Sequence, residues 1–206
     1  MAGIVSVAAL QNSPSHKIDG KVEWSAEAKS VLVLALAHKE TEPELDWWGI
    51  LGGTAGNRRL QITSKRLAQC LNEEFNIDAQ LLPYQPGKGG IFLKDAAALA
   101  GLGIIGANNL LVTPGFGPRI RLRALLLDIQ LVPTGPIDFS PCDNCDRPCW
   151  RACPQKAFSS GSYNSDLCEN QMQEDEADAV IVENAELPMA YIKYCRDCEL
   201  VCPIGR

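Results

Sequence analysis

Hydrophobic and polar residues along the first two thirds of the chain follow patterns typical of both strands and helices. Residues 30–37 (SVLVLALA) form an unbroken apolar run, which predicts a strand covered on both faces. Residues 119–128 (RIRLRALLLD) begin with strict alternation and end in an apolar run, which predicts a strand entering a buried sheet. Helical spacing of apolar residues over 57–76 and the alanine-rich stretch 91–101 predict two helices between them. Strands that alternate with helices indicate an α/β domain.

The first predicted helix has a polar start and one apolar face. Asn57 is its expected N-cap. The apolar face is predicted to contain Leu60, Leu67, Leu71 and Phe75. Cys70 lies one turn from Leu67 near this face, so we expect it to be a buried core thiol. The second helix is predicted to stop at Gly101, because glycine readily ends a helix.

Length and composition place the protein among ordinary globular chains. Its 206 residues fit one domain of usual size or two small ones, and 46% hydrophobic residues are enough for a core. A mean hydropathy near zero excludes disordered and collagen-like classes. No apolar stretch approaches the roughly 18 residues of a membrane span, and no basic residue precedes the short apolar run at the N-terminus. We therefore predict a cytoplasmic protein without a secretory signal.

Charge divides the chain into two parts. Basic and acidic residues balance over residues 1–138, whereas residues 139–206 hold 6 basic and 12 acidic residues. Prolines and a glycine in PTGPIDFSPC (133–142) mark the boundary between these two predicted domains. The acidic balance argues against nucleic acid as the main partner, because phosphate contacts need Lys and Arg. A docking redox protein is expected to offer a basic patch.

Nine cysteines are the strongest chemical signal in the sequence. An odd number in a cytoplasmic chain argues against structural disulfides and favours metal binding. With Cys70 set aside, the remaining eight are Cys142, Cys145, Cys149, Cys153, Cys168, Cys195, Cys198 and Cys202. The first run reads C-x2-C-x3-C-x3-C-P, one residue longer than the run of bacterial ferredoxins.

Eight cysteines are the number that two four-iron, four-sulfur (4Fe–4S) clusters require. The alternatives are one cluster with unused cysteines, or a four-thiolate zinc site. Zinc would leave four cysteines without a ligand role, so we predict two clusters.

A glycine segment precedes the second predicted strand. Gly101, Gly103 and Gly106 have the G-x-G-x-x-G spacing of a dinucleotide-binding motif, and Asp128 stands where the ribose-binding acid would be. The context differs, because the segment follows a predicted helix and leads into a strand. Glycines here would instead let the backbone approach a large flat ligand. Asn108 and Asn109 are the predicted polar contacts to that flat ligand.

Residues 94–128 (KDAAALAGLGIIGANNLLVTPGFGPRIRLRALLLD), followed by the cysteine runs, resemble the epoxyqueuosine reductase family and the related reductive dehalogenases. The positions that match the family motif are Ala100, Gly101, Leu102, Gly103, Ile105, Gly106, Asn108, Leu110, Leu111, Pro114, Gly117 and Pro118. EAKSVLVLALAH (27–38) is similar to the family's early strand.

The resemblance implies a nitroreductase-like α/β domain that holds cobalamin, followed by a ferredoxin-like module with two clusters. It implies that one cluster is bound by Cys142, Cys145, Cys149 and Cys202, and the other by Cys153, Cys168, Cys195 and Cys198. Neither His16 nor His38 has the sequence context of a cobalt ligand, so the corrinoid is expected to lack one from the protein.

The chain also departs from the family. Ala107 replaces the family's usual lysine, and Gly87 stands where epoxyqueuosine reductases have an acid that serves as proton donor. The catalytic residues are therefore not identified, and the next carboxylate is Asp95 on the predicted helix. The sequence stops four residues after Cys202, without the helical extension that helps relatives hold tRNA, so tRNA is not the expected substrate.

Basic residues near the glycine segment have two interpretations each. Arg119, Arg121 and Arg123 alternate on one strand face, either as the solvated face of an edge strand or as contacts for an anion, a corrinoid side chain or an acidic electron donor. Lys94 is predicted to be a helix-surface lysine, with a substrate or proton-relay role as the alternative. The predicted corrinoid contacts are Gly101, Gly103, Gly106, Asn108, Asn109 and Arg121.

The sequence thus predicts an iron–sulfur oxidoreductase that passes single electrons through two clusters to a corrinoid. Its expected partners are a low-potential ferredoxin or flavodoxin as donor, and a small molecule or a corrinoid protein as acceptor. The alternative is a non-catalytic electron carrier whose α/β domain is a docking scaffold without corrinoid. A vacant or collapsed pocket beside the glycine segment would favour that alternative.

Overall fold

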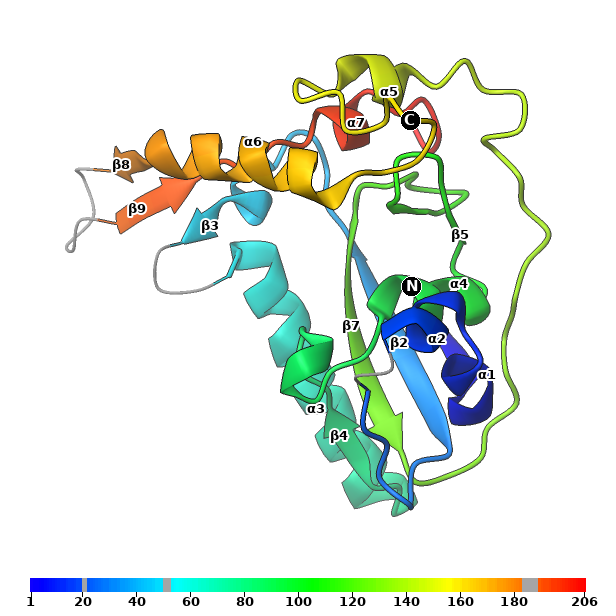
Figure 1. The fold of residues 1–206 in the computed structure, drawn as a ribbon. Coiled ribbons are helices and arrows are strands. Elements are labelled where there is room, and N and C mark those ends of the chain that lie inside the picture. Colours follow the sequence, from blue (N-terminus) through cyan, green and yellow to red (C-terminus); the bar gives the residue numbers. More distant parts are fainter. Residues whose placement is uncertain (20–21, 50–52, 183–188) are drawn as a thin grey trace.

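The computed structural model describes residues 1–19, 22–49, 53–182 and 189–206 (Figure 1). Its main sheet has the strand order β1-β2-β7-β4, and each neighbouring pair is antiparallel. The strands are β1 (Ala2–Ser6), β2 (Ser30–Ala37), β7 (Ile120–Leu127) and β4 (Ala79–Leu81). The strands predicted at 30–37 and 119–128 are therefore confirmed as β2 and β7.

Helices cover both faces of this sheet (Figure 1). One face carries α1 (Val7–Gln11), α2 (Pro14–Asp19) and α4 (Leu93–Leu99), and the opposite face carries α3 (Ala55–Phe75). Because both faces are covered, β2 and the second half of β7 are apolar on either side. The predicted mixed α/β architecture is confirmed, although its sheet is antiparallel.

The main apolar core lies between α4 and the sheet. Its buried members include Val31, Val33 and Ala35 of β2, Ala124 of β7, and Ala96 and Ala97 of α4. The small alanine side chains let the helix pack closely on the strands. This packing fixes the end of α4, from which the glycine segment leaves.

Helix α3 differs from its prediction at both ends. It begins at Ala55, and the N-cap is Thr54, whose hydroxyl accepts a hydrogen bond from the amide of Asn57 at 3.0 Å. Asn57 was the predicted cap, and that prediction is wrong by one turn. Phe75 is 62% exposed and Cys70 is partly exposed. Neither is a core residue, because the buried positions of α3 all lie in its N-terminal half.

Strand β7 is an interior strand of the sheet, since it pairs with β2 and with β4. The interpretation of its arginines as the solvated face of an edge strand is therefore wrong. Arg119, just before the strand, and Arg123 are buried, at 5% and 4% exposure, and Arg121 is half-buried. Each of them must have partners inside the protein.

Residues 139–206, called the cysteine module below, contain short elements around the cysteines. They are α5 (Pro148–Ala152), α6 (Ser165–Ala177), β8 (Val180–Val182), β9 (Met189–Ile192) and α7 (Asp197–Leu200). Strand β3 (Trp48–Gly49) pairs with β9, so residues 1–138, called the α/β part, contribute a strand to the module's sheet. The predicted boundary stays a prediction.

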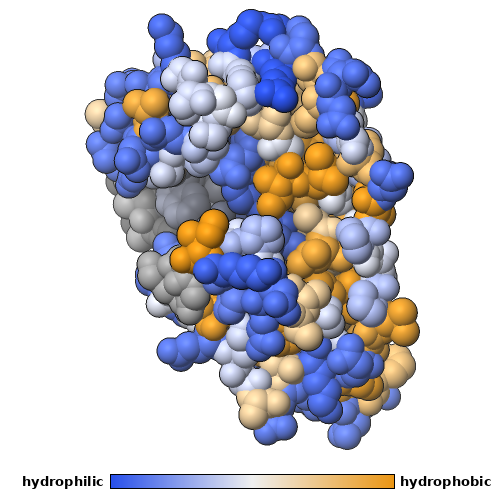
Figure 2. Space-filling view, turned by 45° about the vertical axis from the view of Figure 1, so that its right-hand side comes forward, coloured by the Kyte–Doolittle hydropathy of each residue, from blue (hydrophilic) through white to orange (hydrophobic). Residues whose placement is uncertain are grey.

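A long segment without helix or strand joins β7 to α5 and runs along one side of the molecule (Figure 1). It is anchored midway by Thr134, whose hydroxyl accepts a hydrogen bond from the amide of Ile4 at 2.8 Å. Figure 2 shows this side, with apolar residues exposed in the middle of the face and hydrophilic ones at its upper and lower ends. Within the described ranges, no helix is both long and apolar enough to cross a membrane.

Candidate metal centre

Four of the eight cysteines line one small cavity of about 20 Å³. They are Cys142, Cys145, Cys149 and Cys202. The first three come from the loop before α5 and from α5 itself, whereas Cys202 follows α7 at the far end of the module. The α/β part closes the cavity with Ala107, Asn108 and Val112. The fold therefore joins the first cysteine run to one cysteine of the second.

The other four cysteines, Cys153, Cys168, Cys195 and Cys198, do not line this cavity and are called the second group below. Cys198 lies near Cys195 and Cys168, Cys195 lies near Cys153, and the hydroxyl of Tyr163 is hydrogen-bonded to Cys168. Cys168 is supplied by α6, and Cys195 and Cys198 by the segment around α7. The cavity brings together the four cysteines of the first set that the resemblance implies. The assignment of all eight cysteines to two clusters stays a prediction.

Burial raises the pKa of two of these thiols well above the usual value. Burial and the neighbouring thiols of Cys202, Cys142 and Cys145 raise the pKa of Cys149 to about 11. Burial and the thiol of Cys195 raise the pKa of Cys198 to about 12. A bound metal needs thiolates, so metal binding at either group would release protons.

Backbone amides point at one sulfur in each group. The amide of Ala107 donates a hydrogen bond to Sγ of Cys142 at 3.4 Å, and the amide of Ala157 donates one to Sγ of Cys153 at 3.3 Å. Such donors stabilise thiolate charge and adjust the potential of an iron–sulfur cluster. Within the described residues, no three His, Cys, Asp or Glu side chains converge on a position for a single metal ion. Cysteine thiolates are the usual ligands of iron–sulfur clusters, so the donor chemistry of the first group fits such a cluster.

Aromatic residues form a wall beside the two groups. Trp150 stacks on Phe158 with ring centroids 5.9 Å apart, and Phe158 contacts Tyr163 at 5.7 Å. The indole nitrogen of Trp150 donates a hydrogen bond to the carbonyl of Ala107 at 2.7 Å. This wall was not predicted from the sequence. The available signal was the position of Trp150 between Cys149 and Cys153.

The three predicted corrinoid glycines pack against the protein itself. A Cβ atom would lie 2.9 Å from Cα of Gly135 at Gly101, 2.2 Å from the carbonyl oxygen of Val112 at Gly103, and 2.6 Å from Cγ2 of Val112 at Gly106. Close approach of two chain segments therefore accounts for these glycines. The reason given for these glycines, room for a flat ring at their Cα atoms, is therefore wrong, and their role as corrinoid contacts stays a prediction.

The two asparagines connect the glycine segment to its surroundings. Asn108 is 4% exposed, and its Nδ2 donates a hydrogen bond to the carbonyl of Cys198 at 3.2 Å. The carbonyl of Asn109 accepts a hydrogen bond from Nζ of Lys94 at 2.7 Å. Burial lowers the pKa of Lys94, which is half-buried rather than a surface lysine. These contacts fix the turn that covers the first cysteine group.

The three arginines have protein partners. Arg119 donates hydrogen bonds to the carbonyls of Glu199 at 3.5 Å, Cys202 at 3.1 Å and Ile204 at 2.6 Å. Arg121 forms an ion pair with Glu199 at 3.2 Å.

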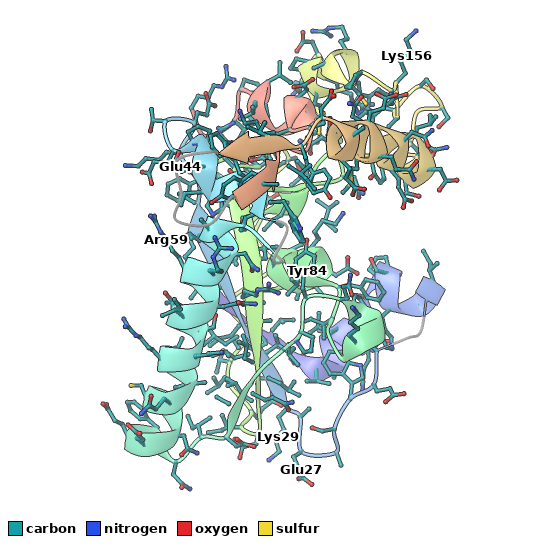
Figure 3. All side chains as sticks on the ribbon, turned by 90° about the vertical axis from the view of Figure 1, so that its left-hand side faces the viewer. Glu27, Lys29, Glu44, Arg59, Tyr84 and Lys156 are labelled. Carbon is teal, nitrogen blue, oxygen red and sulfur yellow. The ribbon has the colours of Figure 1, made fainter. Side chains whose placement is uncertain are left out.

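Arg123 donates a hydrogen bond to Asn57 and lies over the ring of Tyr84, 5.0 Å from its centroid. Tyr84 itself is 61% exposed and is labelled in Figure 3.

Gly87, which stands where epoxyqueuosine reductases have an acid, is exposed in this chain. Gly87 lies in the exposed turn η2 (Pro86–Lys88), and a Cβ atom there would meet nothing within 4 Å. Asp95 does not replace the acid, because its carboxylate is buried and accepts hydrogen bonds from the hydroxyl and the amide of Ser15 at 2.8 and 3.1 Å. The structure assigns neither residue as a proton donor.

The protein thus combines an α/β fold with a cavity lined by four cysteines and with four further cysteines in the same module, which defines a candidate iron–sulfur protein. No family model matches the chain. It is 31% identical over 129 residues to a tetrachloroethene reductive dehalogenase of Sulfurospirillum multivorans, which covers 54% of this chain and 26% of that protein. It is 30% identical over 145 residues to an epoxyqueuosine reductase of Aliivibrio fischeri, which covers 69% of this chain and 38% of that protein.

Solved structures share the fold over most or all of the chain. An epoxyqueuosine reductase in complex with a modified tRNA-Tyr stem loop matches with a TM-score of 0.66 and 18% identity, covering all of this chain and 61% of that one. A reductive dehalogenase described with a mechanism for B12-dependent dehalogenation matches with a TM-score of 0.53 and 18% identity, covering 76% and 23%. The protein is therefore a homologue of these two groups of reductases and spans about a third of its curated relatives' length.

Proposed function

We propose that the protein is an iron–sulfur oxidoreductase that passes single electrons through two 4Fe–4S clusters. The first cluster is assigned to Cys142, Cys145, Cys149 and Cys202, and the second to Cys153, Cys168, Cys195 and Cys198. The observation that carries the proposal is the meeting of the two distant cysteine runs around one cavity. Its homology to reductases supports the same class.

The chain's own residues would bind and shield the clusters. The amides of Ala107 and Ala157 donate hydrogen bonds to the sulfur atoms of Cys142 and Cys153, and the wall of Trp150, Phe158 and Tyr163 would pack beside the clusters. Bound clusters would supply one-electron transfer at low potential. A ferredoxin or flavodoxin is the proposed electron donor.

The proposed electron acceptor is a small molecule or the corrinoid of another protein. A relative is described as B12-dependent, which favours corrinoid chemistry in this group. The Cα atoms of the three glycines face backbone and side-chain atoms of the same chain, so no step is assigned to a corrinoid bound there. The same packing favours a second candidate function, a non-catalytic electron carrier with the α/β part as docking scaffold.

Iron content tests the cluster proposal. Anaerobically reconstituted protein should hold about eight irons, the Cys202→Ala variant about four, and the Cys70→Ala control about eight. Stoichiometric zinc without iron would overturn the proposal. Replacing Cys70 is a matched control, because this thiol lies on α3, outside the cysteine module.

Anaerobic addition of cob(II)alamin then separates the two functions. A corrinoid-dependent reductase should bind or reduce the cobalamin, seen by EPR and visible absorption. Cluster-loaded protein that neither binds nor reduces it is an electron carrier. One relative binds a tRNA stem loop, whereas the acidic cysteine module predicts no tRNA binding here, which a gel-shift titration at physiological salt would test.

A further inference from the structure

A buried group of charged side chains lies where the start of β7 meets α7. Asp46, the last residue of the turn η1 (Pro43–Asp46), has a side chain that is only 3% exposed. One carboxylate oxygen lies 2.6 Å from Nδ1 of His38 and 2.5 Å from Nη2 of Arg121. The other pairs with Arg196. Asp46 is thus held by three cationic or hydrogen-bonding partners.

Glu199 completes the group from the cysteine module. Its side chain is 6% exposed, with Oε2 3.2 Å from Nη2 of Arg121 and Oε1 2.5 Å from Nη2 of Arg196. Each of the two guanidiniums therefore bridges the two carboxylates. Removing one member of such a buried set leaves an uncompensated charge, which is strongly unfavourable.

Two members of this charged group are sequence neighbours of the proposed ligands of the second cluster. Arg196 lies between Cys195 and Cys198, and Glu199 directly follows Cys198. Asp46 and Arg121 belong to the α/β part, so the segment that supplies two ligands is held from outside the cysteine module. A loop of a few residues with two metal ligands depends on such contacts for its conformation.

The charges of the group balance. Asp46 and Glu199 carry two negative charges, and Arg121 and Arg196 two positive ones. The neighbouring Arg119 contacts Glu40 at 3.7 Å. His38 is buried, and its ring lies so close to Gly56 that a Cβ atom there would overlap it. Neutralising Asp46 would leave one excess positive charge beside the ligand segment, in surroundings that screen it weakly.

We propose that Asp46 is a positioning residue for the second cluster and lowers its reduction potential. Through Arg196 it fixes the segment that bears Cys195 and Cys198. A reduced cluster carries one more negative charge, so a nearby carboxylate disfavours reduction. This inference rests on the proposed function, since it requires a cluster at the second cysteine group.

The test is the Asp46→Asn variant, which keeps the side chain's size and removes its charge. Redox titration followed by EPR, in the Cys202→Ala background where only the second cluster is expected, should show a potential shifted to more positive values. Asp128→Asn is the matched control. This residue directly follows β7, about 23 Å from Arg121 at about 3.3 Å per strand residue, which is beyond the screening length of roughly 10 Å.

An unchanged potential in Asp46→Asn, with the cluster retained, would overturn the inference, as would an equal shift in Asp128→Asn. If Asp46→Asn in the protein with Cys202 intact loses the second cluster while the first stays loaded, the positioning role is supported, and Glu199→Gln in the Cys202→Ala background becomes the variant to titrate. An unchanged reduction potential in Glu199→Gln would overturn the proposed effect of these buried charges on the reduction potential of the second cluster. Failure of the unsubstituted protein to load any cluster would instead overturn the proposed function.

Discussion

The guanidinium of Arg119 donates a hydrogen bond to the carbonyl oxygen of Cys202 across 3.1 Å. Arg119 stands at the start of an interior strand of the α/β part, and Cys202 lines the cavity of the first cysteine group. The same guanidinium reaches the carbonyls of Glu199 and Ile204. One buried side chain therefore holds the segment that ends in the fourth cysteine of that group.

Replacing Arg119 by Met should destabilise the protein by at least about 2 kcal/mol, because three carbonyl groups lose a charged donor. The first cluster should be lost before the second. Arg119→Lys should give an intermediate result, since an ammonium group lacks the planar fork of donors. Urea unfolding and iron content measure the two effects.

Arg59→Met is the control for that experiment. Arg59 projects from α3 with a side chain that is 65% exposed, and its contact with Glu42 is 3.8 Å long (Figure 3). Its replacement should change the free energy of unfolding by less than about 0.5 kcal/mol. Equal losses in the two variants would contradict the role given to Arg119.

Gly56→Ala should destabilise the protein by about 1 to 3 kcal/mol. Glycine to alanine usually stabilises a helix interior by about 1 kcal/mol, but a Cβ atom at this position would lie 2.1 Å from Cε1 of His38. The buried ring cannot move away without breaking its contact with Asp46. Thermal or urea unfolding measures whether the unfolding free energy of Gly56→Ala falls or rises.

Gly87→Ala provides the comparison, because the added methyl group would meet nothing within 4 Å. We expect a change in unfolding free energy of no more than about 0.5 kcal/mol. If Gly56→Ala instead stabilised the protein, His38 would not be packed against Gly56 as described.

A low pH should remove the contribution of the Asp46 carboxylate to the stability of the fold. Burial by itself raises the pKa of this carboxyl group, but its hydrogen bond with His38 and the charges of Arg121 and Arg196 outweigh burial and lower the pKa. A lowered pKa contributes stability above the unfolded value of about 3.9, and this contribution is lost as the pH falls through the folded pKa.

The difference in unfolding free energy between the unsubstituted protein and Asp46→Asn should therefore be constant from about pH 7 to about pH 5 and shrink below about pH 4. Urea unfolding of both full-length proteins across this range measures it. A difference that persists undiminished at the lowest pH would show that the charge of Asp46 is not what stabilises the fold.

The sequence by itself determined the elements whose signals are local. Apolar runs of strand length fixed β2 and β7, the alanine-rich stretch fixed α4, and cysteine spacing predicted the metal ligands. Such patterns survive in any context, because side-chain periodicity and ligand spacing act over a few residues. The grouping of the cysteines came from resemblance to known proteins rather than from spacing.

Only the tertiary structure decided how polar residues far apart in the sequence are paired. Asp46, Arg121 and Glu199 lie in segments that no local pattern connects, and their burial depends on where β7 and α7 meet. The arginines of β7 alternate as they would on a solvated face, and the strand's interior position made them structural. The glycine segment likewise has the spacing of a ligand-binding motif, but its Cα atoms face Gly135 and Val112 because the chain packs against itself there.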